Sequence, residues 1–161
     1  MLADHEKRIL RRLRRTLRHP GAPPAGTIPR VPSFRLPAFA ELVGIEIVET
    51  DKSRVVGRIK LGPQHSNGRD RVHGGAIMTL ADTLGAIATV INLPPGSVTT
   101  TLESKTNFLA AGRGDYLIGE STPLHVGRRT MVWQTTIRDT ENRRVAVVTQ
   151  TQLVLPRTSE S

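Results

Sequence analysis

The chain has no cysteine and few aromatic residues, and each deficit narrows its function. None of its 161 residues is Cys, and only 3% are Phe, Trp or Tyr. The lack of cysteine excludes disulfide frameworks, thiolate zinc sites and cysteine nucleophiles. The scarcity of aromatic rings argues against a nucleic-acid surface built on base stacking. The core must therefore be built mainly from Val, Ile, Leu and Ala.

Long apolar runs are also scarce, and only residues 74–93 reach membrane length. This run has Asp82 near its middle together with several Gly, Ala and Thr residues, which favours a buried core helix over a membrane span. The charged beginning of the chain is not followed by an apolar stretch typical of secretory signals, so we expect a cytoplasmic protein. The length favours a single domain, and 37% hydrophobic residues suffice for its core.

Positive charge is concentrated at the beginning of the chain. Residues 1–20 hold seven Lys and Arg against two Asp and Glu, a balance of +5 within a net charge of +9. Apolar residues at helical spacing predict a basic amphipathic helix over residues 4–18, either solvated or attracted to an anionic membrane or acidic partner. This segment is too short for a helix-turn-helix domain, so specific nucleic-acid binding is not expected.

Proline and glycine divide the chain into parts. Six prolines between positions 20 and 37 predict a semi-rigid linker, so we expect a basic helix and linker over 1–37, a folded domain over 38–157 and a tail over 158–161. Within the domain, turn signals and apolar patterns predict a helical turn at 38–42, a long helix at 75–92, and strands at 45–50, 54–61, 98–109, 115–125, 130–139 and 143–155. One apolar helix among antiparallel-type strands predicts an α+β fold with a sheet curved around that helix.

The beginning of the long helix carries the residues with the most chemical potential. Asp82 is a lone carboxylate on an apolar helix, and burying it costs several kcal/mol unless it is compensated. The helix is preceded by the sequence His73-Gly74-Gly75. A helix N-terminus offers unpaired N–H groups, and glycine lets a ligand approach that backbone closely. A carboxylate and an anion-binding backbone on one helix favour a functional site.

The spacing of these residues resembles the hotdog-fold acyl-CoA thioesterases, in particular the PaaI-like branch of phenylacetic acid degradation. The similarity covers about residues 39–156. It rests on Asn67 six positions before His73, on Asp82 nine positions after it, and on Thr101 at the start of the next strand. Two further matches are Asn107-Phe108-Leu109 and His125-Val126-Gly127-Arg128.

The chain departs from the family pattern at two places. Leu109-Ala110-Ala111-Gly112 lacks the arginine that usually follows this strand in the family, so part of the family's nucleotide contact is missing. Asp70, flanked by Arg69 and Arg71, stands where the family usually has a glycine in the loop that borders the site. The second departure predicts an unusual substrate preference, because that loop borders the site.

The resemblance implies thioester hydrolysis and gives each residue a role. The N–H of Gly74 polarises the carbonyl, and Asp82 is the nucleophile or the general base. Gly75 leaves room for the acyl group, although both glycines also suit a tight entry into the helix. Asn67 holds the thioester or the water, although Asn before Gly is also an ordinary turn residue.

The remaining site residues have weaker roles in this scheme. Thr101 is expected to hydrogen-bond the water or Asp82 from the partner's side, and His73 to orient the loop or contact substrate. A lone histidine before a helix is also a frequent structural hydrogen-bonder. For the phosphates of coenzyme A, the candidates are Arg128 and Arg129, followed by Arg71, Arg69 and Arg113.

The distance between Gly74 and Asp82 predicts a shared site. Eight residues of one helix span about 12 Å, too far for both to act on one carbonyl. A two-fold axis that sets a second helix antiparallel would pair Asp82 of one protomer with Gly74 of its partner. The family is built in this way, so we expect a homo-oligomer, a dimer of hotdog dimers.

Two alternatives to hydrolysis remain open. One is a non-catalytic acyl-CoA sensor or scaffold that uses the same pocket; the other is a hotdog dehydratase, whose His and Asp arrangement is not found here. We expect no cofactor other than the coenzyme A of the substrate. We also expect no metal, since the five histidines lack ligand spacing.

Overall fold

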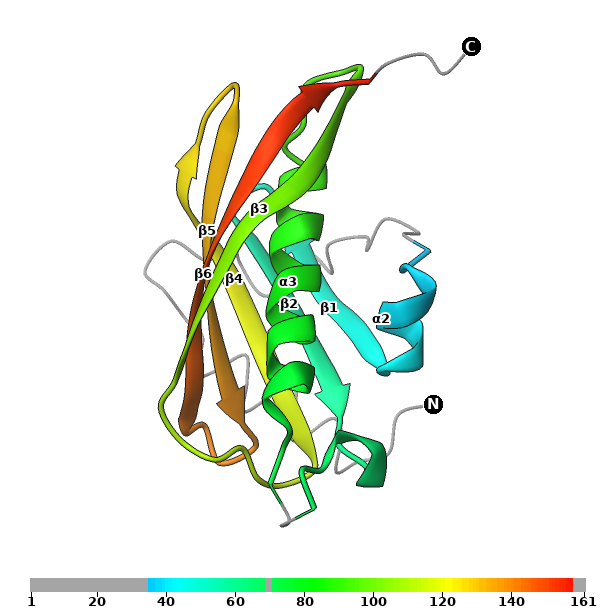
Figure 1. The fold of residues 1–161 in the computed structure, drawn as a ribbon, viewed down its shortest axis with the longest axis vertical. Coiled ribbons are helices and arrows are strands. Elements are labelled where there is room, and N and C mark those ends of the chain that lie inside the picture. Colours follow the sequence, from blue (N-terminus) through cyan, green and yellow to red (C-terminus); the bar gives the residue numbers. More distant parts are fainter. Residues whose placement is uncertain (1–34, 69–70, 158–161) are drawn as a thin grey trace, which may run out of the picture. The chain divides into compact units, whose positions relative to one another are not determined.

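The computed structural model describes residues 35–68 and 71–157, which form a curved sheet with a long helix against it (Figure 1). The basic helix, nearly all of the linker and the tail predicted from the sequence lie outside the described residues. The elements in chain order are α2 (Ala38–Leu42), β1 (Ile45–Asp51), β2 (Arg54–Lys60), the 3₁₀ turn η1 (Pro63–His65), α3 (Gly74–Val90), β3 (Ser97–Phe108), β4 (Tyr116–Val126), β5 (Thr130–Asp139) and β6 (Arg144–Pro156). The predicted α+β fold is confirmed.

The sheet has six strands in the order β1-β2-β4-β5-β6-β3, and every neighbouring pair is antiparallel. A short polar turn joins β1 to β2, as Asp51-Lys52-Ser53 predicts. The chain then leaves β2, passes through α3 and returns as β3 at the opposite edge of the sheet. Within the described part of the chain, β3 pairs only with β6, so its 12 residues form an open edge.

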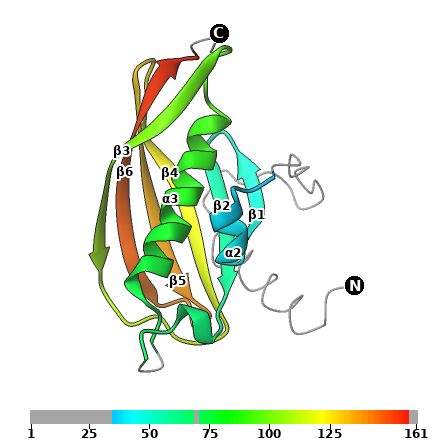
Figure 2. The ribbon, with the colours of Figure 1, turned by 45° about the vertical axis from the view of Figure 1, so that its right-hand side comes forward.

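Helix α3 lies along the concave side of the sheet (Figure 2). Two glycines let it approach closely, because a Cβ atom at Gly57 or Gly119 would come within 2.7 Å or 2.6 Å of a methyl group of Leu84. Near the end of the helix, Trp133 Nε1 donates to the hydroxyl of Thr89 at 2.8 Å. These contacts fix both the position of the helix along the sheet and its distance from the sheet.

One stripe of α3 is not covered by its own sheet. Met78 and Val90 are 41% and 43% exposed, and Asp82 lies between them on the same stripe. The sheet curves around one side of the helix, as the sequence predicts, and leaves this stripe open among the described residues. Among these residues no helix is long and apolar enough to cross a membrane.

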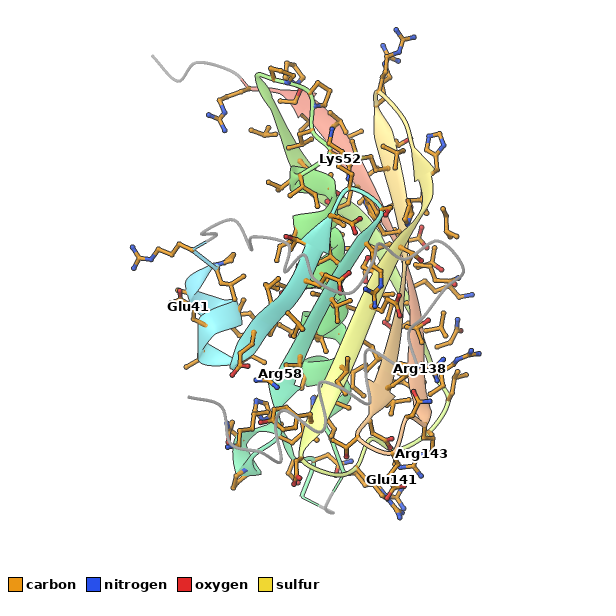
Figure 3. All side chains as sticks on the ribbon, turned by 180° about the vertical axis from the view of Figure 1, so that it is seen from behind. Glu41, Lys52, Arg58, Arg138, Glu141 and Arg143 are labelled. Atoms are coloured by element: carbon orange, nitrogen blue, oxygen red, sulfur yellow. The ribbon has the colours of Figure 1, made fainter. Side chains whose placement is uncertain are left out.

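The convex face of the sheet is occupied by ion pairs. Arg58 of β2 donates to Glu46 at 2.7 Å and lies over the ring of Tyr116, 4.8 Å from its centroid. Beside the turn from β5 to β6, Arg143 forms an ion pair with Asp139 at 2.8 Å. Figure 3 shows Arg58 and Arg143 from this side. These charges are partnered within the fold, whereas Asp82 lies on the helix side of the sheet.

Candidate active site

Asp82 lines a cleft between α3 and the segment that contains α2. The cleft has a volume of about 620 Å³. Its lining is mostly apolar and consists of Arg35, Leu36, Pro37, Phe39 and Ala40 from one side, Met78, Thr79, Asp82, Thr83, Ala86, Ile87 and Val90 from α3, and Ser104 from β3. The half-buried carboxylate is thus the acidic group of an otherwise largely apolar cavity.

The carboxylate of Asp82 is held on one oxygen. The hydroxyl of Thr101 donates to Oδ1 at 3.3 Å, and Gln150 Nε2 donates to the same atom. Burial raises the pKa of Asp82 above its ordinary value, and the hydrogen bond from Thr101 partly offsets this rise. The sequence predicts that Thr101 reaches this site from the partner's side. In the structure the hydrogen bond from Thr101 to Asp82 forms within one chain, because β3 lies directly beside its own α3.

A bulge in β3 decides which side chains face α3. The pairing with β6 shifts register between Thr101 and Glu103. Such an extra residue reverses the alternation of a strand, so Ser104 instead of Glu103 faces the cleft. Glu103 is exposed, and a second carboxylate is thereby kept away from Asp82.

Two glutamines of β6 support this arrangement, and the sequence prediction missed both. Gln150 and Gln152 are each 1% exposed. Gln152 Nε2 donates to the hydroxyl of Thr101 at 2.9 Å. A signal for them exists in the sequence: positions 148, 150, 152 and 154 share one face of the strand, and two glutamines there interrupt an apolar row.

The N-terminus of α3 leaves one backbone donor open. His73 caps the helix, since its Nδ1 accepts from the N–H of Gly75 at 2.9 Å. A Cβ atom on Gly75 would lie 2.9 Å from that same nitrogen, so glycine is needed for the cap. Among the described residues, no acceptor is found for the N–H of Gly74. His73 thus has the capping role, and Gly74 has the free donor that the sequence predicts.

Comparisons with known proteins agree with this geometry. The family model of the thioesterase superfamily matches residues 70–146. Over these residues the chain is similar to the thioesterase superfamily. The 1,4-dihydroxy-2-naphthoyl-CoA hydrolase of Listeria monocytogenes is 27% identical over 99 residues, which cover 62% of this chain and 80% of the hydrolase. Alignments to several other curated relatives span about half the length of those proteins.

Two solved structures share the hotdog fold of this chain. A thioesterase from Haemophilus influenzae superposes with a TM-score of 0.72 at 26% identity, covering 76% of this chain and 85% of that one. The PaaI protein from the phenylacetic acid degradation operon of Escherichia coli superposes with a TM-score of 0.68 at 26% identity, covering 74% and 85%. The predicted resemblance is confirmed.

Asn67 lies on the loop that leads into α3. Its N–H donates to the carbonyl of Arg71 at 2.9 Å, which closes the loop, and the N–H of His73 donates to the carbonyl of His65 at 2.7 Å. The ring of His65, which is buried, contacts Gly62 and Val43 and anchors the loop from below. Arg69 and Asp70 lie outside the described residues, so their predicted influence on the substrate stays a prediction.

The arginines that are candidates for binding phosphate lie at two opposite ends of the sheet. Arg71 and Arg113 line a second cavity of about 700 Å³ together with Gly68 and Gly112. Arg128 and Arg129 are exposed on the hairpin between β4 and β5, at the end of the sheet where α3 finishes (Figure 1). Within one chain, Arg128 and Gly74 are therefore separated by the length of α3.

Proposed function

We propose that the protein hydrolyses an acyl-CoA thioester to the free acid and coenzyme A. The observation that carries the proposal is that α3 holds two reactive groups. These are the carboxylate of Asp82, half-buried in an apolar cleft, and the open N–H of Gly74 at the start of the helix. Similarity to the thioesterase superfamily over residues 70–146 and to a naphthoyl-CoA hydrolase supports it.

The chemistry follows from the two groups. The N–H of Gly74, at the positive end of the helix dipole, polarises the thioester carbonyl and stabilises the oxyanion. Asp82 attacks the carbonyl carbon or takes a proton from the water that attacks it. In the route where water attacks, the C–S bond breaks, the proton taken by Asp82 passes to the sulfur, and coenzyme A leaves as the thiol beside the free acid. In the route where Asp82 attacks, cleavage of the C–S bond leaves an acyl anhydride on Asp82, and a water molecule then cleaves this anhydride to the free acid while its proton goes to the thiolate.

A dimer brings the two groups to one carbonyl. On one helix they are separated by about 12 Å. The open edge of β3 offers unpaired backbone groups along 12 residues, and pairing with the same strand of a second copy would be isologous. In that dimer the helices run antiparallel, so Asp82 of one protomer serves the carbonyl bound at Gly74 of its partner.

The same dimer gathers the candidate arginines. Because the helices are antiparallel, Arg128 and Arg129 of one protomer come to the end of the dimer that holds Gly74, Arg71 and Arg113 of its partner. Arginine binds phosphate through a fixed fork of donors. We therefore assign this end to the phosphates of coenzyme A, and the apolar cleft beside Asp82 to the acyl group.

The test is thiol release from aryl, short, medium and long acyl-CoA esters. We expect hydrolysis by the wild-type protein and a loss of about a thousandfold or more in Asp82→Asn with the fold retained, in line with removal of a catalytic acid or base. Glu141→Gln, an exposed carboxylate on the turn from β5 to β6, is the matched control and should keep wild-type turnover.

Two results would overturn parts of the proposal. Unchanged turnover in Asp82→Asn would remove Asp82 from the mechanism. Saturable binding of acyl-CoA without any thiol release would favour the sensor over the enzyme.

A further inference from the structure

A row of polar side chains leads to Asp82 from the side opposite the cleft. The hydroxyl of Thr99 lies 3.0 Å from Gln152 Oε1 and also 3.0 Å from the carbonyl of Leu153, either of which it can donate to. Gln152 Nε2 donates to the hydroxyl of Thr101 at 2.9 Å. Thr101 in turn donates to Asp82 at 3.3 Å. The donors thus all run in one direction and end on the carboxylate.

Gln150 adds a direct contact to this row. Its Nε2 donates to Asp82 Oδ1 and lies 3.3 Å from the hydroxyl of Thr101. The reverse orientation of the amide would place Oε1 against the carboxylate, and two acceptors repel each other. The chemistry of its neighbours therefore fixes which end of the amide faces Asp82.

The other end of this amide is left without a partner. Gln150 Oε1 is buried and accepts no hydrogen bond from the described residues. It lies against Gly85, where any Cβ atom would collide with it. A buried polar atom without a partner destabilises a fold, and native proteins rarely keep one. Both the empty space at Gly85 and the unsatisfied oxygen serve to bring Nε2 to Asp82.

We propose that Gln150 is a positioning residue for the carboxylate of Asp82, assisted by Gln152 through Thr101. The two donors to Asp82 both arrive at Oδ1, and among the described residues none donates to Oδ2. Oδ1 is thus fixed, and Oδ2 is left for the thioester or the water. This inference rests on the proposed function and adds to it two residues outside the family's motif.

The surroundings of Asp82 contain few charges that could act in place of Gln150. Among the described residues that line the cleft, Arg35 is the one other charged side chain. From β3, Thr101 and Ser104 face the helix, and from β6 the two glutamines do so, all of them neutral. Because a donor to the charged form favours ionisation, removing Gln150 raises the pKa of Asp82 further.

The test is Gln150→Met, which keeps the volume and removes the donor. We expect kcat to fall by about tenfold to a hundredfold through loss of orientation, with KM little changed. The acid limb of the kcat/KM profile should move to higher pH, because less Asp82 is ionised at a given pH. A carbon-13 titration of the Asp82 carboxyl group, assigned with Asp82→Asn, should show the same upward movement.

Gln134→Met is the matched control. Gln134 lies on β5 next to Trp133, which faces α3, so its side chain lies on the other face of the sheet. If Gln150→Met does not fold, Gln152→Met is measured in its place, with a smaller effect of the same sign expected. An unchanged midpoint and acid limb in a folded variant, or an equal change in Gln134→Met, would overturn the inference. Absence of thiol release in the wild type would contradict the proposed function alone, since the titration needs no turnover.

Discussion

Asp82 is a single residue whose negative charge lowers the stability of the fold. It is half-buried beside apolar side chains, and its pKa is raised mainly by that burial. A raised pKa means that the folded protein binds the proton more tightly than the unfolded chain does. Ionisation of Asp82 near neutral pH therefore lowers the stability of the folded state.

The pH dependence of stability should reveal this cost. The stability contributed by the protonated form is complete below the ordinary Asp pKa, about 4, and is lost as the pH rises through the higher folded-state pKa. We therefore expect Asp82→Asn to melt at a higher temperature than the wild type at neutral pH, with the gain shrinking in acid. Thermal melts of both proteins at several pH values measure it. A gain independent of pH, or a loss at neutral pH, would contradict the assignment.

At the scale of elements, the N-terminus of α3 separates two tasks between adjacent residues. His73 caps the helix by accepting from Gly75, and this leaves the N–H of Gly74 to a ligand. His73 has φ −64° and ψ 137°, a conformation that suits a residue before proline, and the first position of a helix tolerates proline well. The donor can therefore be deleted with little change to the helix.

Gly74→Pro and Gly74→Ala form a matched pair that isolates this donor. Both add a Cβ atom about 3.1 Å from the ring of Phe108, so they share this contact, and proline adds the rest of its ring. Only proline removes the N–H. We expect kcat of Gly74→Pro to lie about a hundredfold to a thousandfold below that of Gly74→Ala, the usual loss for an oxyanion donor. Equal activities in thiol-release assays would show that Gly74 does not polarise the carbonyl.

The sequence predicts elements better than it predicts their contacts. Turn residues such as Pro94-Pro95-Gly96 and the strand patterns place each element predicted between residues 38 and 155 within two residues of its observed bounds. The neighbours of Asp82 are harder, because Gln150 lies 68 positions away and reaches it only through the register of β3, β6 and α3. A glutamine in a strand ordinarily predicts an exposed position. The bulge after Thr101 has no clear signal in the sequence.

At the scale of the whole molecule, the proposed mechanism gives each chain two half-sites. Gly74 and Asp82 lie two turns apart on α3, and β3 presents an open edge at the side of the sheet. In the proposed dimer each protomer contributes one half to each of two equivalent sites. Loss of either residue in both protomers thus disables both sites, although each chain keeps one intact half.

Mixing two inactive variants tests this sharing. A dimer of one Asp82→Asn chain and one Gly74→Pro chain has one site with both groups intact and one with neither. Random exchange of protomers should therefore restore roughly one quarter of wild-type activity, because half of the dimers are mixed and each has one working site. Thiol release is measured after co-refolding, with each variant refolded alone as the control. Continued inactivity of the verified mixed dimers would show that the site is not shared in this way.

The contact between Gly85 and Gln150 also constrains how this protein can change over generations. Any side chain at position 85 would occupy the place of the glutamine oxygen. A homologue with a side chain at position 85 must therefore have a shorter residue at position 150, and it then lacks the hydrogen-bond donor to Asp82. Positions 85 and 150 should therefore vary together among descendants of this chain, although neither lies in the motif by which the family is known.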